Sequence, residues 1–299
     1  MTASDMGENP SNASGKHRWR SLLFVPAHLP KFVDKAHTRG ADALVLDLED
    51  AVPWVSKAEA RSSLAGSITR LRQQGASVLV RVNNGLRALS ADLDAAIVDG
   101  VEAVVLPKVE SAEWIVAIAE EMLMLEQERG LPPGEIRLVV QIETPTALPR
   151  LHAIASAHSR LVAMALGPED FSASVGGQPM PDLLLAPNLA VLFAARAGGL
   201  LPLGFIGSIG EFADLPRFRD TARQARELGF AGAFAIHPAQ VAILNEEFAP
   251  PAHELEWARR VVAAEEAARS EQLGAFTVDG KMVDRPVILR ARALLSFDP

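Results

Sequence analysis

The stretch Leu138-Val139-Val140-Gln141-Ile142-Glu143 is a mostly apolar run that ends in a carboxylate. A buried parallel strand has this pattern because both of its faces are covered, and the residue at its carboxyl end faces the mouth of an α/β fold. A second run, residues 161–166, leads in the same way into Gly167-Pro168-Glu169-Asp170. We therefore expect Glu143 and Asp170 to face one site.

Two carboxylates on neighbouring strand ends repel each other unless a positive charge lies between them. A hard divalent cation bound by oxygen ligands removes the repulsion, so Glu143 and Asp170 indicate a magnesium site. Taken alone, either acid could instead cap the helix that follows its strand, because a carboxylate accepts the free N–H groups of a first helical turn. The pairing, and the further acids at other strand ends, favour the metal.

Similar runs recur between residues 20 and 250 and alternate with segments that have apolar residues at helical spacing. The expected strands are 21–26, 43–48, 77–82, 103–107, 138–142, 161–166, 202–206 and 233–236. This alternation predicts an α/β fold closed into a (β/α)8 TIM barrel, because an open sheet usually has fewer strands. We place the barrel domain at residues 17–250.

The segments on either side of this domain differ from it. Residues 1–16 are rich in Ser, Asn, Gly and Asp and are expected to be a disordered tail. Residues 251–299 are expected to be a C-terminal helical extension, with a turn at Asp279-Gly280 and a last helix opened by Pro286. Such an extension completes or covers an active site, or reaches a neighbouring subunit. Within the barrel, the proline-rich stretch 179–187 is expected to be a long active-site loop.

The composition of the 299 residues excludes several classes of function. The net charge is −8 and no long basic run offsets it, which argues against nucleic acid as a partner. Cysteine is absent, so disulfides, thiolate catalysis and cysteine-ligated zinc are excluded. We see neither a stretch of membrane-spanning length nor a signal peptide, so we expect no membrane partner and a cytoplasmic location.

The chemistry of a TIM barrel lies at the carboxyl ends of its strands, where this sequence places Asp47-Leu48-Glu49-Asp50 and Arg81. An arginine in an interior pattern is costly unless it is paired. Arg81 is therefore expected to bind a substrate carboxylate or enolate oxygen with two N–H groups, which a guanidinium does better than an ammonium. The alternative is an ion pair with Glu49 or Asp50 that only holds the mouth together, and both can apply at once.

Lys108 follows the fourth expected strand and raises the alternative of a Schiff-base lysine, the nucleophile of a metal-independent aldolase. The acids at this mouth would raise the pKa of Lys108 and keep it charged and unreactive. We therefore assign Lys108 a structural or ion-pairing role.

At these positions the chain resembles the citrate lyase β-subunit-like proteins of the HpcH/HpaI aldolase family. The matching segments are RSLLFVP (20–26), DLEDAV (47–52), RVN (81–83), LPKVE (106–110), IETP (142–145), GPEDF (167–171), AIHPAQV (235–241) and DGKMVD (279–284). Each segment is short, but their order and spacing make a chance similarity improbable.

The resemblance implies a TIM barrel that binds Mg²⁺ and cleaves or forms the C–C bond of a β-hydroxyacyl-CoA thioester, such as malyl-, citramalyl- or citryl-CoA, through an enolate. It implies that Glu143 and Asp170 hold the metal and that Arg81 binds the substrate. It also implies that Asp284 reaches the site of a neighbouring subunit in a homotrimer or hexamer. We expect Glu143 and Asp50 to contact the substrate as well, and Asp284 or Glu49 to move the proton between the hydroxyl group and the enolate carbon.

Two other functions remain open at this point. The first is a class II aldolase that acts on free hydroxy-keto acids without CoA. The second is a citrate lyase β subunit that is active only with acyl-carrier and transferase partner subunits.

Overall fold

Eight strands pair side by side in the computed structural model, which describes residues 18–210, 212–270 and 274–295. They are β1 (Ser21–Pro26), β2 (Ala43–Asp47), β3 (Val78–Arg81), β4 (Ala103–Leu106), β5 (Arg137–Ile142), β6 (Leu161–Leu166), β7 (Leu201–Leu203) and β8 (Ala233–Ala235). Neighbouring strands are parallel throughout, in the order β7-β6-β5-β4-β3-β2-β1-β8. The expected N-terminal tail, residues 1–16, lies outside the described residues.

Backbone contacts bring the two ends of this sheet together. Leu203 at the end of β7 pairs in parallel with Gly232, next to β8. The N–H of Gly204 donates to the carbonyl of Gly232 at 2.9 Å, and the N–H of Ala231 donates to the carbonyl of Pro202 at 2.9 Å. The prediction of a (β/α)8 TIM barrel is therefore confirmed.

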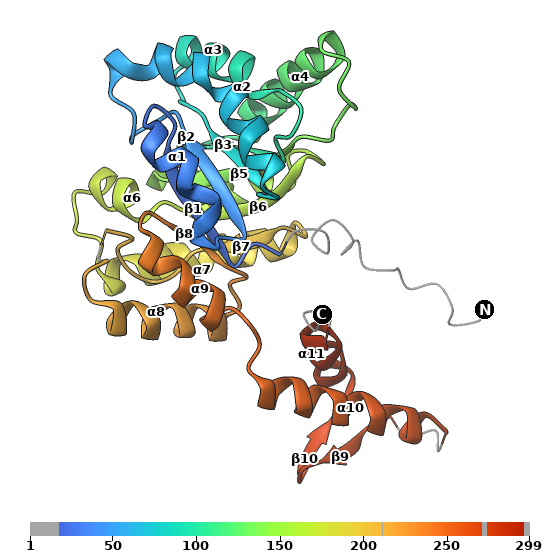
Figure 1. Ribbon diagram of the computed structural model, residues 1–299. Coiled ribbons are helices and arrows are strands. Elements are labelled where there is room, and N and C mark those ends of the chain that lie inside the picture. Colours follow the sequence, from blue (N-terminus) through green and yellow to red (C-terminus); the bar gives the residue numbers. More distant parts are fainter. Residues whose placement is uncertain (1–17, 211, 271–273, 296–299) are drawn as a thin grey trace. The chain divides into compact units, whose positions relative to one another are not determined.

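Helices connect successive strands and lie outside them (Figure 1). They are α1 (Pro30–Ala36), η2 (His37–Arg39), η3 (Trp54–Ser56), α2 (Lys57–Gln73), α3 (Leu86–Ala96), α4 (Ala112–Glu128), η4 (Pro145–Arg150), α5 (Leu151–Ala155), α6 (Pro168–Ser174), α7 (Pro181–Ala197), α8 (Leu215–Leu228) and α9 (Pro238–Glu247). Helix α4 shows why they form, because its buried Ile115, Ile118, Ala119 and Met122 repeat at helical spacing.

The prediction of a long loop at 179–187 is wrong. Helix α7 begins at Pro181 and continues through Pro187 to Ala197. Pro181 stands at the first helical position, where its missing N–H costs nothing. Leu184, Pro187 and Asn188 are buried, so packing against the barrel offsets the helical hydrogen bond that Pro187 cannot donate.

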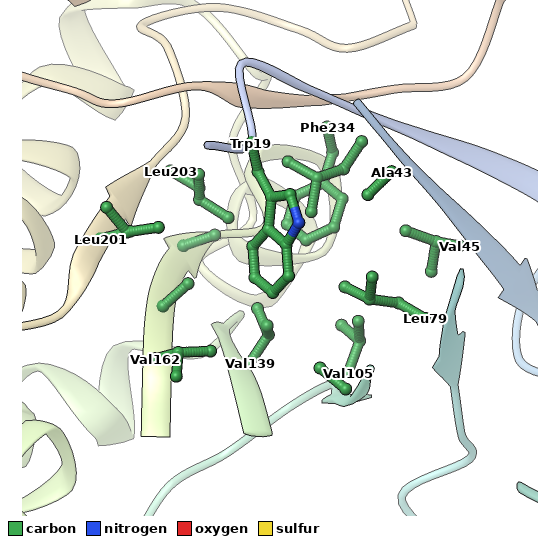
Figure 2. Packing of buried hydrophobic residues seen from close by; sticks show 14 residues of the cluster. Trp19, Ala43, Val45, Leu79, Val105, Val139, Val162, Leu201, Leu203 and Phe234 are labelled. Atoms are coloured by element: carbon green, nitrogen blue, oxygen red, sulfur yellow. The ribbon is translucent and has the colours of Figure 1, made fainter. Parts of the chain in front are cut away.

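A tryptophan closes the amino end of the barrel. Trp19 precedes β1, is 4% exposed, and lies among apolar side chains of the barrel interior (Figure 2). These side chains include Ala43, Val45, Leu79, Val105, Val139, Val162, Leu201, Leu203 and Phe234. Removing a buried tryptophan of this kind costs about 3–5 kcal/mol. With this end filled, open space in the barrel lies at the carboxyl ends of the strands.

The chain divides into one unit that ends at Glu246 and a second that begins at Glu247. The second contains α10 (Ala252–Ser270), β9 (Phe276–Val278), β10 (Lys281–Val283) and α11 (Arg285–Leu295), packed around buried apolar residues such as Val261 and Val283. Asp279 and Gly280 join β9 to β10 with φ of 52° and 73°, the conformation of a tight hairpin turn. None of the helices described is both long and apolar enough to span a bilayer.

Candidate active site

A cavity of about 340 Å³ opens at the carboxyl ends of the strands. This volume lies in the range of small-molecule sites, about 300–1,000 Å³. Its polar lining includes Asp50, Arg81, Gln141, Glu143, Glu169 and Asp170. The barrel therefore gathers charged side chains from several strand ends around one space, as the strand-end pattern predicts.

Glu143 and Asp170 line this cavity from neighbouring strands. Glu143 directly follows β5 and is 2% exposed, whereas Asp170 stands in the first turn of α6, after β6, and its side chain is 41% exposed. Oε2 of Glu143 accepts the backbone N–H of Lys108 at 3.0 Å, so this carboxylate is bound to the segment that follows the neighbouring strand β4. Burial, and then the negative charges of Asp170 and Glu49, raise the pKa of Glu143 to about 8.

Arg81 ends β3 and is held by two acids from the end of β2. Its Nε and Nη2 donate to Oδ1 and Oδ2 of Asp47 at 2.8 and 2.7 Å, and its Nη1 lies 3.1 Å from Oε2 of Glu49. Burial disfavours the charged guanidinium and by itself would lower the pKa of Arg81. The hydrogen bonds and charge of Asp47, together with the charge of Glu49, outweigh burial, so the pKa of Arg81 is raised. The guanidinium carbon also lies 4.4 Å from the ring centre of Phe24.

These contacts bear on both interpretations of Arg81. The expected ion pair with Glu49 is present, and the two-point hydrogen bond goes to Asp47. A guanidinium has five N–H donors, so three contacts to Asp47 and Glu49 leave donors for a substrate oxygen. Nothing in the sequence pattern singles out Asp47, rather than its acidic neighbours, as the main partner of Arg81.

Lys108 connects the acids of the mouth. Its Nζ lies 2.6 Å from Oε1 of Glu49, 3.7 Å from Oδ2 of Asp50 and 3.6 Å from Oδ1 of Asp170. Burial disfavours the charged ammonium and by itself would lower the pKa of Lys108. The hydrogen bond and negative charge of Glu49 outweigh this effect, so the pKa of Lys108 is raised. The prediction that these acids keep the lysine charged is confirmed. Its φ of 53° is unusual for a non-glycine residue, a feature that concentrates at functional sites.

Glu49 is buried beside Arg81 and Lys108. It lines an open pocket that adjoins the cavity, together with Asp50, Asn83 and Lys108. Burial raises the pKa of Glu49, against the opposing attraction of Arg81 and Lys108. Its Oε2 is ion-paired with Nη1 of Arg81 at 3.1 Å, without hydrogen-bond geometry to any of the described residues.

Glu143 and Asp170 fit a magnesium ion. Within the residues that the structure describes, no group of three or more His, Asp or Glu side chains is arranged to hold a metal ion. Mg²⁺ does not require such a cage, because it usually keeps several waters and binds one or two carboxylates together with substrate oxygens. A cation here would also relieve the repulsion that raises the pKa of Glu143.

The family model described as HpcH/HpaI aldolase/citrate lyase matches residues 20–238, which span the whole set of barrel strands. The chain belongs to this family. It is 36% identical over 284 residues to citrate lyase subunit beta of Escherichia coli (strain K12), covering 93% of this chain and 92% of that protein. It is 34% identical over 283 residues to a (3S)-malyl-CoA thioesterase of Cereibacter sphaeroides (strain ATCC 17029 / ATH 2.4.9), covering 94% of each chain.

A solved structure agrees with this placement in the HpcH/HpaI family. The crystal structure of CitE from Mycobacterium tuberculosis in complex with magnesium, acetoacetate and coenzyme A is similar to this chain with a TM-score of 0.74. The two chains are 30% identical, and the match covers 95% of this chain and 98% of that one.

Asp284, the remaining site residue expected from the sequence, belongs to the C-terminal unit. It lies between β10 and α11 and is partly exposed, and its backbone carbonyl accepts the N–H of Ile288 at 3.0 Å. The acids Glu49, Asp50, Glu143 and Asp170 all belong to the barrel unit.

Gln141 lines the cavity but is not among the residues predicted from strand ends. It lies within β5, is buried, and its Oε1 has no hydrogen-bond partner in the described residues. The sequence does carry a signal for it, because a polar amide inside a buried apolar strand needs a partner. Phe24 and Phe234, stacked with ring centres 4.9 Å apart, form an apolar wall that the sequence pattern does not reveal.

Proposed function

We propose that this protein is a Mg²⁺-dependent carbon–carbon lyase that cleaves or forms the C–C bond of a β-hydroxyacyl-CoA thioester, such as malyl-, citramalyl- or citryl-CoA. The observation that carries the proposal is the presence of Glu143, Asp170 and Arg81 around one cavity at the strand ends. The names of the relatives, citrate lyase subunit beta and malyl-CoA thioesterase, support this class of substrate. So does the magnesium and coenzyme A complex of the M. tuberculosis protein.

Glu143 and Asp170 would hold the metal ion. When bound, Mg²⁺ draws electron density from carbonyl and carboxylate oxygens and so stabilises an enolate. Glu143 is kept in place by the backbone N–H of Lys108, and its burial keeps bulk water away from the ligand oxygens.

Arg81 would bind the keto acid fragment, which resembles oxaloacetate, pyruvate or glyoxylate. Asp47 fixes the plane of the guanidinium by its two hydrogen bonds, so the remaining N–H groups are already oriented before the substrate arrives. Donors that need no reorganisation stabilise developing negative charge strongly in a buried site. Asp50 and Glu143 line the same cavity and would contact the substrate hydroxyl group.

In the cleavage direction, a carboxylate takes the proton of the β-hydroxyl group and the C–C bond breaks. The electron pair of that bond moves into the thioester carbonyl, and the resulting enolate carbon then takes a proton, which gives a keto acid and an acyl-CoA. Glu49 suits the proton transfer because burial raises its pKa, although its Oε2 is ion-paired with Arg81 and its Oε1 with Lys108. Asp284 is the second candidate, supplied by a neighbouring subunit.

The same proposal includes a homotrimer or hexamer and a cytoplasmic location. An interface that repeats head to tail around a ring can place the C-terminal unit of one subunit at the barrel mouth of the next.

The test is an assay of the purified protein alone with malyl-, citramalyl- and citryl-CoA and added Mg²⁺. We expect keto acid and acyl-CoA in equal amounts, quantified by chromatography, and no product after chelation of the metal. Free CoA without keto acid would indicate thioester hydrolysis instead. Cleavage of free hydroxy-keto acids would indicate a class II aldolase, and turnover only after addition of acyl-carrier and transferase subunits would indicate a citrate lyase β chain. No turnover under any of these conditions would overturn the proposal.

A further inference from the structure

A buried lysine lies behind the turn that carries Glu49. Lys57 is the first residue of α2, and its Nζ donates to the carbonyl of Leu48 at 2.7 Å and to the carbonyl of Glu49 at 2.9 Å. Both carbonyls belong to the turn that follows β2. Lys57 therefore binds the backbone from which the Glu49 side chain extends.

The N–H groups of the same turn are bound from the other side. The Asp47 carboxylate accepts the N–H of Glu49 at 2.9 Å and the N–H of Ala51 at 3.1 Å, while it also binds Arg81. Asp47 thus fixes the N–H groups of the turn, and Lys57 fixes two of its carbonyls. The turn has little freedom to change its direction.

A buried network supports the Lys57 side of the turn. The carbonyl of Leu48 also accepts Nδ2 of Asn83 at 2.8 Å. Asn83 is held in turn by the fully buried Asp92, whose Oδ2 accepts its backbone N–H at 2.7 Å and its Nδ2 at 2.6 Å. Oδ1 of Asp92 accepts Nε of Arg61 at 2.6 Å. Asn83, the second donor to the Leu48 carbonyl, is therefore itself anchored by Asp92.

A merely structural role does not explain the choice of lysine. Burying an ammonium against two neutral carbonyls is unfavourable, because the carbonyls do not neutralise its charge. What the ammonium adds is two donors to the turn and a positive charge behind Asp47, Glu49 and Asp50. Both are useful only if the direction and charge of those acids matter.

We propose that Lys57 is a positioning residue of the lyase reaction. By binding the carbonyls of Leu48 and Glu49, it fixes the direction in which the Glu49 side chain leaves the turn. It thereby keeps the Glu49 carboxylate between Lys108 Nζ, at 2.6 Å, and Arg81 Nη1, at 3.1 Å. This inference rests on the proposed function, because it requires Glu49 to transfer the proton.

Lys57→Met tests the role of the ammonium, because methionine keeps a flexible side chain and removes the donors. We expect kcat to fall about 100-fold, the effect of misplacing a reacting group by about 1 Å. KM and the Mg²⁺ dissociation constant should change less than about threefold, because Arg81, Glu143 and Asp170 keep their own partners. Lys57→Arg, which keeps the charge and the donors, should lose less than Lys57→Met. Lys35→Met, at an exposed position of α1, is the matched control and should leave kcat unchanged.

Chemical rescue gives a readout that loss of structure would not produce. The chain contains no cysteine, so Lys57→Cys introduces the only thiol of the protein. Alkylation of the unfolded chain with 2-bromoethylamine, followed by refolding, restores an ammonium on a side chain of lysine length. We expect this product to recover at least about tenfold in kcat, whereas alkylation with iodoacetamide, which adds a neutral amide, should not. Wild-type protein taken through the same unfolding and refolding sets the reference.

A wild-type kcat in Lys57→Met would overturn the proposal. So would a parallel loss of kcat and metal binding that aminoethylation does not restore. A crystal structure of Lys57→Met provides a measurement that needs no turnover. The distance from Glu49 Oε1 to Lys108 Nζ should increase beyond hydrogen-bonding reach, and an unchanged distance would rule out the positioning role. If the wild type has no lyase activity, the proposed function fails while this distance still decides whether Lys57 positions Glu49.

Discussion

The Glu143 carboxylate fills the space that a side chain at residue 167 would need. A Cβ atom on Gly167 would lie 2.6 Å from both Cγ and Oε1 of Glu143, closer than real Cβ contacts. The φ of Gly167 is −89°, which any residue adopts, so the backbone conformation does not require glycine. Gly167 is needed because the end of β6 must leave room for the Glu143 carboxylate from the end of β5.

Gly167→Ala should therefore displace Glu143 and weaken Mg²⁺ binding by about 10- to 100-fold, as other disturbances of a metal ligand's surroundings do. Isothermal titration calorimetry of Mg²⁺ measures the effect. Gly66→Ala is the control, because Gly66 lies in the exposed part of α2 and its added Cβ meets only ordinary contacts. This control should stabilise the protein by about 0.5–1 kcal/mol and leave Mg²⁺ affinity unchanged. Wild-type affinity in Gly167→Ala would show that Glu143 can move without loss.

Arg81→Lys should lower kcat by about 100- to 1,000-fold, the usual effect of removing one preorganised donor from a developing negative charge. Lysine cannot form the two-point hydrogen bond. It keeps the positive charge beside Asp47 and Glu49, so the fold should be retained. Steady-state kinetics and circular dichroism check the two parts. Near-normal turnover would mean that Arg81 serves only the ion pairs seen at the mouth.

Asp47→Ala should destabilise the protein by about 3–5 kcal/mol, because it leaves the buried charge of Arg81 without its main partner. The turn N–H groups of Glu49 and Ala51 would lose their acceptor as well. Urea unfolding measures the change. Asp34→Ala is the comparison, because the Asp34–Arg70 pair is exposed and should contribute only about 0–1 kcal/mol. Equal losses in the two variants would contradict the role given to Asp47.

Mg²⁺ binding should depend on pH through Glu143. Its pKa is raised to about 8 in the metal-free protein, so below pH 8 this carboxyl group holds a proton that the metal must displace. The apparent affinity should rise about tenfold for each pH unit up to 8 and then level off, since one proton is released for each ion bound. Calorimetry in buffers of different ionisation enthalpy at pH 6.5 should detect that proton. Glu143→Gln should bind weakly and show no such slope.

The same pKa shift affects the stability of the metal-free protein. A carboxyl group whose pKa is higher in the folded than in the unfolded state favours folding at low pH, where it is protonated in both states. As pH rises, the unfolded state loses the proton first, and this contribution is lost. For Glu143 the loss extends from the ordinary value near 4.5 up to about 8. Thermal unfolding with chelator should therefore show a falling melting temperature across this window, and Mg²⁺ should reverse it at pH 8.

The strands could be predicted from the sequence because a barrel strand is buried on both faces, which leaves an uninterrupted apolar run. The runs 21–26 and 161–166 coincide with β1 and β6. The seventh strand is shorter than the expected 202–206, because Gly204 adopts a φ of 142° and turns the chain out of the ladder. Phe205 and Ile206 are buried there without being part of a strand, so their apolar character alone misplaces the strand end.

The rule that chemistry lies at strand ends places Glu143, Asp170 and Arg81 around one cavity, but it does not reveal partners. Which acid Arg81 binds depends on side-chain direction within the turn at 47–50. Asp47 accepts two hydrogen bonds from Arg81, whereas Glu49 is shared between Arg81 and Lys108. Lys57 supports that turn through hydrogen bonds to residues eight and nine positions earlier in the sequence, and no local sequence pattern reveals such contacts. Side-chain hydrogen bonds between elements are therefore the part of the site that required the structure.

If Asp284 rather than Glu49 transfers the proton, Asp284→Asn should remove lyase turnover while Mg²⁺ binding and subunit assembly persist, because Asp284 lies in the C-terminal unit and the proposed metal ligands lie in the barrel. If Asp284 acts on a neighbouring subunit, mixing this variant with Glu143→Ala should restore activity. In a ring with random mixing, about one quarter of the sites would combine an intact Glu143 with an intact Asp284 from the next subunit. Activity of the mixture, measured after subunit exchange is confirmed by mass spectrometry, checks this value. No recovery would exclude a shared site, and full activity of Asp284→Asn alone would assign the proton transfer to Glu49.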